Sequence, residues 1–511
     1  YSTTVTCSAC GFVYKCPHCD ITLTFHKSIN SLRCHYCGYT KIKSEVCPNC
    51  RGMSLNFMGL GTEKLELEIK KKMTNSYCIY IIGGTMQKIK VNGYTLDEEQ
   101  TKPIIDNPKY SIIIAGAGSG KTLTLVGKIK FLLENNIYKE NEILCLSFTN
   151  EATINLKNSI LKNTGKEIDT LTFHKLALKI LSLANLNYGI VSDDYLSYIV
   201  DELFKSYFFG NDLLKDAFLK HNNIYFFKEK RLKELLKSND ISKLKKTIIA
   251  FINLFANTNK DKYAFYEFIK TTKKKHLLQI IYAIYTIYLS EKESTGQIDF
   301  DDMIKLATNT LTEKNISLPY KMIIIDEFQD TSIVRFNLIK KIVAQNDASL
   351  CVVGDDYQSI YHFSGCDLEL FLNFTKMYKD AKLYFLNSTY RNSNELIKTL
   401  GNFIMKNNSQ IKKTLKSNKT YKKPIKIVYY KNENTILRKV LKKIPQNNEV
   451  FILGRNKMDI KKYTKTLPYK EENNHIYFKN DVHSIRYLTI HASKGLESDT
   501  VIILNVNNTL Y

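Results

Sequence analysis

The segment that most constrains the fold is a strand pattern that runs directly into a glycine-rich turn. Residues 111–115 (S-I-I-I-A) are apolar enough for a strand buried on both faces, and the turn continues as Gly116-Ala117-Gly118-Ser119-Gly120-Lys121-Thr122. A strand, such a turn and a following helix form a P-loop, whose backbone N–H groups surround phosphate oxygens at the helix N-terminus. In that arrangement Lys121 reaches the β- and γ-phosphates and the Thr122 hydroxyl binds Mg²⁺. Ala115 takes the place of the usual first glycine, so residues 115–122 are the candidate nucleotide site.

Two further apolar runs end in polar residues that suit the same chemistry. Residues 321–325 (K-M-I-I-I) predict a buried strand, and Asp326 and Glu327 follow it. Asp326 would hold Mg²⁺ and Glu327 would polarise the attacking water, whereas the alternative is an ordinary acidic end to a strand. Residues 349–353 predict a third strand, and Gln358 in the next loop would sense the γ-phosphate. Functional residues at the ends of three strands predict an α/β fold with a parallel sheet.

Together with short motifs elsewhere, these residues resemble the superfamily 1 DNA helicases of the UvrD/Rep type, over residues 96–510. The resemblance implies two RecA-like P-loop lobes with parallel sheets, and ATP and Mg²⁺ bound between them. It places Gln100 of L-D-E-E-Q and Tyr390 of T-Y-R on the adenine base, and Glu497 on the ribose. Arg391 would reach the γ-phosphate. The candidate catalytic residues are therefore Lys121, Asp326, Glu327, Gln358 and Arg391.

The same resemblance implies a groove for single-stranded or partial duplex DNA. Aromatic rings stack on bases without regard to sequence, at about 1–3 kcal/mol per base. For any single aromatic residue, a place in the hydrophobic core is the alternative. Basic runs such as 228–237 and 273–275 would contact phosphates, with a solvated helix face as the alternative. The candidate DNA-contacting residues are Phe148, Thr149, Asn150, Phe173, His174, Tyr361, Phe363, Thr489, His491 and Lys494.

Eight cysteines within the first 50 residues form four C-x-x-C pairs. Two such pairs complete one tetrahedral Zn²⁺ site, so four pairs predict two structural zinc ions. Residues 11–15 alone separate the first two pairs, which is short for a ribbon returning to one ion, whereas residues 20–33 between the second and third pairs suit a hairpin. The spacing therefore predicts nesting, with an inner site of Cys16, Cys19, Cys34 and Cys37 and an outer site of Cys7, Cys10, Cys47 and Cys50.

The stretch from Tyr1 to about Glu68 resembles the cysteine-rich segment of the PriA family of primosomal helicases, through C-P-H-C-D, C-H-Y-C-G, C-P-N-C and G-L-G-T-E. In that family the two zinc ions are nested in the same way. The resemblance implies a role in DNA handling or in docking replication or repair proteins. The alternative is a zinc staple that only folds a small domain.

The composition is that of a globular protein with an anionic partner. Lys and Arg exceed Asp and Glu by 74 to 50, a net charge of +24, and a hydrophobic content of 44% excludes a disordered chain. The charge favours nucleic acid, although AT-biased codons, which enrich Lys and Asn, would produce the same excess. No apolar run reaches the ~18 residues of a membrane span. Clustered cysteines in a chain this long favour metal in a reducing compartment, so a cytoplasmic location is expected.

Five parts are predicted. They are a two-zinc module (1–76), a linker (77–93), a first RecA-like lobe (94–180 and 291–385), a helical insertion like domain 1B (181–290) and a second RecA-like lobe (386–511). UvrD and Rep carry a large insertion, called 2B, in their second lobe. Only about a hundred residues separate Arg391 from Thr489, which leaves room for little or no such insertion here. The strings D-F at Asp299 and T-Y-R are most similar to the DNA helicase IV branch.

The resemblance implies an ATP-dependent DNA helicase or translocase with 3′→5′ polarity, acting in repair, recombination or replication restart. The chain begins within a motif and ends at Tyr511, before the family's last motif, A-L-T-R-A-[KR], whose arginine contacts the γ-phosphate. An arginine in that role is worth about 10³–10⁵ in rate. The alternative is therefore an ATP- and DNA-binding remnant or fusion fragment without productive unwinding, in which the zinc module is a docking platform.

Overall fold

The computed structural model divides into two compact units, residues Tyr1–Gln87 and Lys88–Tyr511. Within them the structure describes residues 4–19, 22–26, 30–34, 37–53, 55–58, 89–192, 194–204, 212–221, 239–258, 260–272, 274–361, 365–430, 433–456, 459, 469–472, 475–478 and 484–506. None of the described helices is both long enough and apolar enough to cross a membrane.

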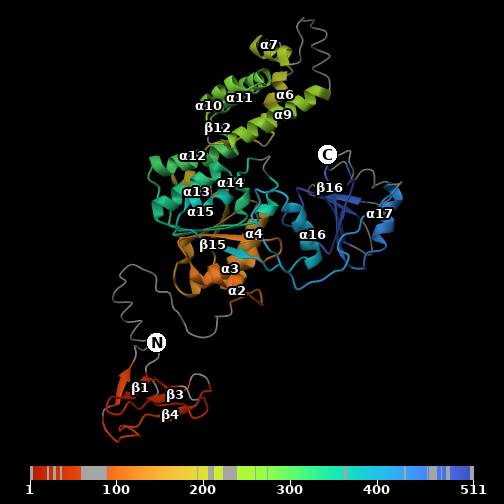
Figure 1. Cartoon of the computed structure of the whole chain (residues 1–511). Helices are drawn as coiled ribbons and strands as arrows, with labels where there is room; N and C mark the ends of the chain where they lie inside the picture. The colour runs from red at the N-terminus through yellow and green to blue at the C-terminus, as the bar shows by residue number, and fades with distance from the viewer. Residues whose placement is uncertain are drawn as a thin grey trace. The chain divides into compact units, whose positions relative to one another are not determined.

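The N-terminal unit is a small antiparallel sheet (Figure 1). Its strand order is β4-β3-β2-β1-β5. Its strands are β1 (Thr4–Cys7), β2 (Thr24–His26), β3 (Ser31–Arg33), β4 (Thr40–Ile42) and β5 (Leu55–Met58). The buried residues of its core include Val5, Leu23, Leu32, Cys16 and Cys34. Because cysteines are part of this core, the packing of the unit and the geometry of its thiols depend on each other.

The second unit is built on a six-stranded sheet in the order β10-β9-β13-β14-β8-β15, and every pairing in it is parallel. The strands are β8 (Tyr110–Ala115), β9 (Ile143–Ser147), β10 (Asp169–Thr172), β13 (Met322–Ile325), β14 (Ser349–Gly354) and β15 (Lys382–Leu386). The central strands are apolar on both faces: in β8, Ile112 lies in one hydrophobic core and Ile113 in another. The three strand runs expected from the sequence are β8, β13 and β14.

Helices cover both faces of this sheet (Figure 1). On the face of Ile113 lie α2 (Glu98–Asp106), α3 (Lys121–Glu134) and α4 (Asn150–Thr164). On the face of Ile112 lie α5 (Phe173–Leu183), α12 (Phe300–Glu313), α13 (Ile333–Asn346), α14 (Leu368–Leu372) and α15 (Phe374–Met377). A hairpin of β6 (Lys90–Val91) and β7 (Tyr94–Thr95) precedes α2. The predicted α/β class is therefore confirmed.

Helices between α5 and α12 form a separate hydrophobic core. They are α6 (Tyr195–Glu202), α7 (Asp212–His221), α9 (Asn239–Ala256), α10 (Lys262–Thr271) and α11 (Lys275–Thr295), which lie side by side (Figure 1). The short parallel pair β11 (Gly189–Ile190) and β12 (Gln297–Ile298) brings the two ends of this helical segment together. Apolar side chains of this helical segment are thus buried between its helices.

A second, smaller sheet follows in the order β17-β18-β19-β16-β20. Its strands are β16 (Glu449–Gly454), β17 (Tyr469–Glu472), β18 (His475–Phe478), β19 (Ser484–Thr489) and β20 (Thr500–Ile503); the helices of this part are α16 (Asn394–Ile404) and α17 (Glu433–Leu441). Strands β16, β19 and β20 are parallel, whereas β17 and β18 form an antiparallel hairpin at one edge. The second sheet is therefore mixed rather than wholly parallel as expected, because this hairpin extends it. The five-part division and the small 2B insertion stay predictions.

Candidate nucleotide and zinc sites

The P-loop joins β8 to α3 and packs against residues that are distant in the sequence. Gly118 and Gly120 have positive φ angles of 74° and 80°, which residues with a Cβ atom rarely adopt. A Cβ atom at Gly120 would lie 2.4 Å from Nε2 of Gln100, and one at Gly118 would lie 2.3 Å from Cβ of Arg391. Conformation and space therefore both require glycine, and the turn is held between Gln100 and Arg391.

Gln100, on α2, fixes this turn through both ends of its carboxamide. Its Nε2 donates to the Ser119 carbonyl oxygen at 3.1 Å, and its Oε1 accepts from the Asp97 backbone N–H at 3.0 Å. The Asp97 carboxylate accepts from the Tyr390 hydroxyl at 2.5 Å, and the Tyr390 backbone N–H donates to the Gly118 carbonyl oxygen at 2.9 Å. The two residues expected on adenine, Gln100 and Tyr390, are thus brought together beside the P-loop.

The carboxylates of Asp326 and Glu327 lie at the end of β13, near Lys121. Nζ of Lys121 is 3.5 Å from Oε1 of Glu327, and Oδ1 of Asp326 accepts from the Glu327 backbone N–H at 2.9 Å. Burial and the negative charge of Glu327 raise the pKa of Asp326 to about 7, against a smaller opposing effect of Lys121. Glu327 also has a φ of +52°, a strained value for a non-glycine residue and one typical of functional sites. A divalent cation would suit this crowded negative charge.

Gln329 connects Glu327 to the neighbouring strand β14. Its Nε2 donates to Oε2 of Glu327 at 2.6 Å, and its Oε1 accepts from the Asp355 backbone N–H at 3.0 Å. Gly354 leaves room for this connection, because a Cβ atom there would lie 2.4 Å from Oε1 of Gln329. Oδ2 of Asp355 also accepts from Nε2 of Gln358 at 2.6 Å. Glu327 and Gln358 are therefore joined through two residues to which no motif assigned a role.

Residues from the loop between β19 and β20 reach the first sheet. Nε of Arg391 lies 2.7 Å from Oε2 of Glu497, so the arginine beside the P-loop pairs with the second sheet. Lys494 forms a buried ion pair with Asp330, which follows β13, and its Nζ lies 4.5 Å from the centre of the Tyr361 ring. Burial raises the pKa of Asp330 to about 6, although Lys494 opposes the shift. In the sequence, the only sign of a role for Asp330 is its place in the acidic stretch of residues 326–330.

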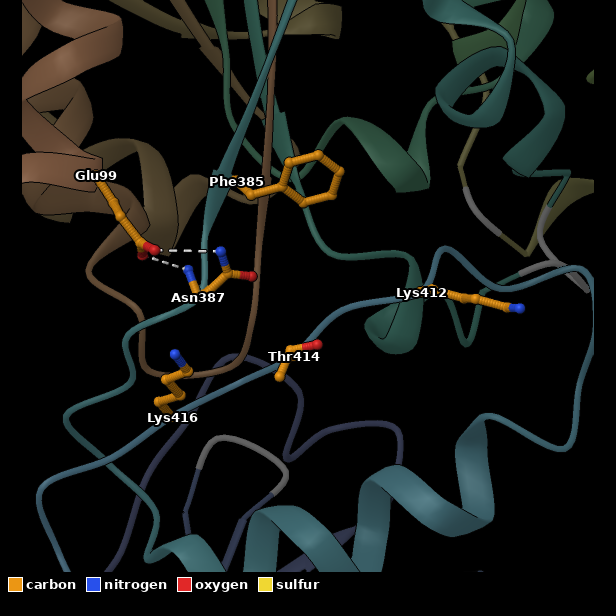
Figure 2. A pocket seen from close by; sticks show the side chains of 6 residues that line it. All are labelled: Glu99, Phe385, Asn387, Lys412, Thr414 and Lys416. Atoms are coloured by element: carbon orange, nitrogen blue, oxygen red, sulfur yellow. Dashed lines mark hydrogen bonds between the residues drawn. The ribbon is translucent and has the colours of Figure 1, made fainter.

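A cavity of about 280 Å³ lies at the carboxyl end of β15 (Figure 2). The Glu99 carboxylate in its wall accepts from the backbone N–H of Asn387 at 2.6 Å and from the Asn387 side chain at 3.2 Å. The cavity is lined by Glu99, Phe385, Asn387, Lys412, Thr414 and Lys416. None of the predicted site residues is in this lining, so the cavity is distinct from the predicted phosphate contacts.

In the N-terminal unit the eight cysteines form two tetrads: Cys7, Cys10, Cys47 and Cys50, and Cys16, Cys19, Cys34 and Cys37. Within each tetrad all sulfur atoms lie within 4.8 Å of one another, a separation that fits four thiolates around one tetrahedral Zn²⁺. A hydrogen bond from Asn49 is the largest cause that lowers the pKa of Cys10 to about 6, which favours the metal-binding thiolate. The grouping is the nested one expected from the spacers.

Comparison with known proteins relates both units to helicases. A profile of the UvrD/REP helicase N-terminal domain matches residues 96–379, more than half of the chain. The chain belongs to the UvrD/REP helicase family. A profile of the cysteine-rich region of the PriA DNA helicase matches residues 16–41, which contain the inner tetrad.

Individual relatives match more than half of this UvrD/REP family member. The "Probable DNA helicase II homolog" of Mycoplasma capricolum subsp. capricolum is 30% identical over 340 residues, 65% of this chain and 44% of the relative. The "ATP-dependent DNA helicase PcrA" of Staphylococcus aureus is 30% identical over 325 residues, 62% of this chain and 40% of the relative. The chain therefore spans less than half the length of these curated relatives. The similarity to the helicase IV branch stays a prediction.

The DNA contact expected for Phe173 from the UvrD/REP motifs is wrong. Its side chain is 2% exposed, within the core on the α5 face of the large sheet, so its ring has no free face for a base. The Phe148 ring lies 5.3 Å away between ring centres and is partly buried, and the guanidinium carbon of Arg335 lies 5.5 Å from it. The core alternative thus holds for Phe173, because the family motif begins a helix whose first apolar residue points inward.

Two other UvrD/REP motifs place their residues at element ends. Oγ1 of Thr149 accepts from the Ala152 backbone N–H at 3.1 Å and caps α4, which leaves Asn150 exposed in the first turn. The His174 ring packs edge-on against Phe300, 5.0 Å between ring centres. These contacts explain the residue types by local structure, and DNA contact by Asn150 and His174 stays a prediction.

Three further candidate DNA contacts, Thr489, His491 and Lys494, lie at the end of β19 and on the loop that follows it. Oγ1 of Thr489 accepts from the Ala492 backbone N–H at 3.2 Å, and the His491 carbonyl oxygen accepts from the Tyr361 hydroxyl at 2.9 Å. Tyr361 thus touches both Lys494 and the backbone at His491. Phe363 and the run 228–237 lie outside the described residues, as does the first residue of the run 273–275.

Proposed function

We propose that this chain binds ATP with Mg²⁺ and hydrolyses it as the motor of a DNA helicase or translocase. The observation that carries the proposal is the ion pair of Lys121 with Glu327 beside the P-loop, together with the hydrogen-bonded chain that joins Glu327 to Gln358. The link from Glu327 through Gln329 to Asp355 and Gln358 places a candidate base and a candidate phosphate sensor in one hydrogen-bonded chain. Family membership supports the same chemistry, because the matched profile covers this part of the chain.

The roles of the residues follow from their contacts. Mg²⁺ supplies charge neutralisation at the β- and γ-phosphates when it is bound, and Thr122 and Asp326 would hold it. Lys121, now beside Glu327, would turn to the phosphate oxygens and free the Glu327 carboxylate. Glu327 would then orient the attacking water and accept its proton, while Gln329 holds its other oxygen in place.

We further propose that hydrolysis moves the chain along single-stranded DNA with 3′→5′ polarity. Two ion pairs support a mechanical connection: Arg391 with Glu497, and Lys494 with Asp330. A phosphate that attracts Arg391 would weaken its pair with Glu497 and shift the second sheet against the first. The pathway proposed is repair, recombination or replication restart, in the cytoplasm, where thiols stay reduced.

The two cysteine tetrads are proposed to hold one Zn²⁺ each. Their role is to fold the N-terminal unit and to present it to DNA or to replication or repair proteins. Support comes from the tetrad geometry and from the match of residues 16–41 to the PriA cysteine-rich region.

The test is steady-state ATP hydrolysis by the full 511-residue chain, with and without single-stranded DNA. DNA-stimulated turnover is expected, and Glu327→Gln should lower kcat by about 10²–10⁴-fold while ATP binding remains, because it removes the base and keeps the shape. Substrates with a 3′ or a 5′ single-stranded tail then test polarity.

Binding of ATP and DNA without DNA-stimulated turnover would contradict the motor proposal. That result would instead favour the ATP- and DNA-binding role with the zinc module as a docking platform. Equal turnover by the wild type and Glu327→Gln would show that the measured hydrolysis does not arise at this site.

A further inference from the structure

An extended segment that no motif identified runs past the nucleotide site. It consists of residues 411–419, the strap. Lys416 of the strap pairs with the T-Y-R region: its backbone N–H donates to the Asn387 carbonyl oxygen and its carbonyl oxygen accepts from the Thr389 N–H, both at 2.8 Å. The strap also reaches the P-loop, because a Cβ atom at Gly116 would lie 2.5 Å from a methyl carbon of Leu415.

Side chains of the strap alternate between two faces. Lys412, Thr414 and Lys416 are exposed and line the cavity of Figure 2. Lys413 points the other way, and its side chain is only 1% exposed. A basic run gives no local sequence signal that one of its lysines is buried, which is why motif analysis missed Lys413.

Lys413 lies between two buried carboxylates. Its Nζ is 2.5 Å from Oδ1 of Asp355 and 2.5 Å from Oδ1 of Asp356, and both acidic side chains are at most 1% exposed. The same Nζ lies 4.1 Å from the centre of the Tyr357 ring. The strap backbone adds a further contact, since the Ile411 N–H donates to Oδ2 of Asp356 at 2.7 Å.

Asp355 is the branch point of the site. Its Oδ2 accepts from Nε2 of Gln358 at 2.6 Å, and its backbone N–H donates to Gln329, which donates to Glu327. Because a carboxylate oxygen accepts this hydrogen bond, Asp355 fixes which end of the Gln358 carboxamide faces it. One N–H of Gln358 is then used by Asp355, and the second is left for a phosphate oxygen.

We infer that Lys413 is a positioning residue for Gln358: it holds the Asp355 carboxylate in place, and this carboxylate orients the carboxamide that senses the γ-phosphate. Without Lys413, Oδ1 of Asp355 would lose the cation that fixes it, and Gln358, which donates to the other oxygen of this carboxylate, would lose its fixed orientation. The inference rests on the proposed ATPase function.

The main test variant is Lys413→Met with Asp356→Asn, which keeps the net charge of the cluster because one cation and one anion are removed together. It should fold with near wild-type thermal stability. Its kcat should fall about 100-fold, since displacement of a catalytic group by about 1 Å costs that much, while KM for ATP changes little. Lys412→Met removes a lysine from the exposed face of the same strap and should leave kcat unchanged.

A double-mutant cycle with Gln358→Ala separates positioning from a general structural role. If Lys413 acts through Gln358, adding the Lys413→Met and Asp356→Asn changes to Gln358→Ala should cause no further loss of kcat. Losses that multiply, or a folded charge-balanced variant with wild-type kcat, would overturn the inference. Lys413→Gln keeps a hydrogen-bond donor at the same place and carries the same cycle if the charge-balanced variant does not fold.

Failure of the proposed function is distinguishable from failure of this inference. Should the wild type show no turnover, equilibrium binding of Mg-ATP and Mg-ADP is compared instead. The wild type should then prefer ATP through Gln358, and the Lys413 variants should lose that preference. If the wild type hydrolyses ATP and the losses of kcat in the double-mutant cycle multiply, the role of Lys413 is rejected and the proposed ATPase function stands.

Discussion

The two units of this chain are stabilised by different physical means. The N-terminal unit has strands of three or four residues, and the described part of its core is a handful of side chains that include cysteines. The second unit has a six-stranded sheet whose central residues are buried on both faces by helices. A small domain with so little apolar burial depends on metals or cross-links, whereas a large sheet does not.

This difference decides how ligands and folding are coupled. In the N-terminal unit the metal site and the core share residues, so loss of metal is loss of structure. In the second unit the proposed nucleotide site lies at strand ends, on a scaffold whose two cores are formed by protein side chains. Substitutions at the proposed nucleotide site should therefore lower activity more than they lower stability. Substitutions of the cysteines should lower the stability of the N-terminal unit more than they lower activity.

Removal of zinc should have the largest effect, and it should be confined to the first unit. Structural Zn²⁺ contributes about 10–16 kcal/mol to small zinc domains, far more than this core can supply. A chelator strong enough to extract Zn²⁺ should abolish hydrogen-exchange protection of β1–β5. Peptides from β8, β13 and β14 should keep their protection in the same sample, which serves as the internal control. Protection of β1–β5 that survives complete loss of zinc would show that packing alone folds this unit.

Paired cysteine substitutions should distinguish the nested arrangement from a sequential one. Cys16 and Cys34 belong to one tetrad, so Cys16→Ser with Cys34→Ser should retain one zinc ion per chain, measured by metal analysis. Cys34 and Cys47 belong to different tetrads, so Cys34→Ser with Cys47→Ser should retain none. A sequential arrangement gives the opposite result for both variants, because it joins Cys7 to Cys19 on one ion and Cys34 to Cys50 on the other.

Local patterns were sufficient for much of the fold. Residues 111–115 could be predicted as a strand because both faces are apolar, and the glycines after it have positive φ angles that require their residue type. The tetrads followed from loop lengths, since a short spacer limits which thiols can meet. Such features are encoded within a few consecutive residues.

Contacts between distant segments were not predictable in this way. Lys413 pairs with Asp355 across about sixty positions, and Lys494 pairs with Asp330 across 164. Nothing in the sequence around either lysine indicates an acidic partner, and only the fold shows that each side chain is buried against one. Phe173 was misassigned for the same reason, because a motif aromatic and a core aromatic have the same local pattern.

Packing substitutions in the large sheet should measure how far it is independent of its ligands. Ile324 in β13 is fully buried, and Ile324→Ala should lower the free energy of unfolding of the second unit by about 2–5 kcal/mol through lost burial and a cavity. Val501 in β20 is 49% exposed, and Val501→Ala should cost less than about 0.5 kcal/mol. Denaturant unfolding with zinc present measures both. Each measurement is made with and without Mg-ATP. If Ile324→Ala destabilises the second unit only when Mg-ATP is present, the packing of the large sheet depends on its ligand.

The smallest effect should come from pH, through Asp330. Burial raises its pKa to about 6 from an ordinary value of 3.8, so between these values the folded protein binds more protons than the unfolded chain. Stability should therefore fall as pH rises through this window and become level above about 6. Asp330→Asn has no carboxyl group to titrate at this position. Between pH 4 and 7 the free energy of unfolding of the wild type should therefore fall by on the order of 2 kcal/mol relative to that of the variant.

Unfolding of both proteins across this pH range tests the sign as well as the size. A difference that stays constant would mean that Lys494 compensates fully for the burial of Asp330, and a difference of opposite sign would mean that the ion pair outweighs burial. The expected sign makes the pair a cost to stability above pH 6. Such a cost suits the proposed motor, in which this contact between the two sheets would break and form again as ATP is consumed, because a strongly stabilising pair would oppose its own opening.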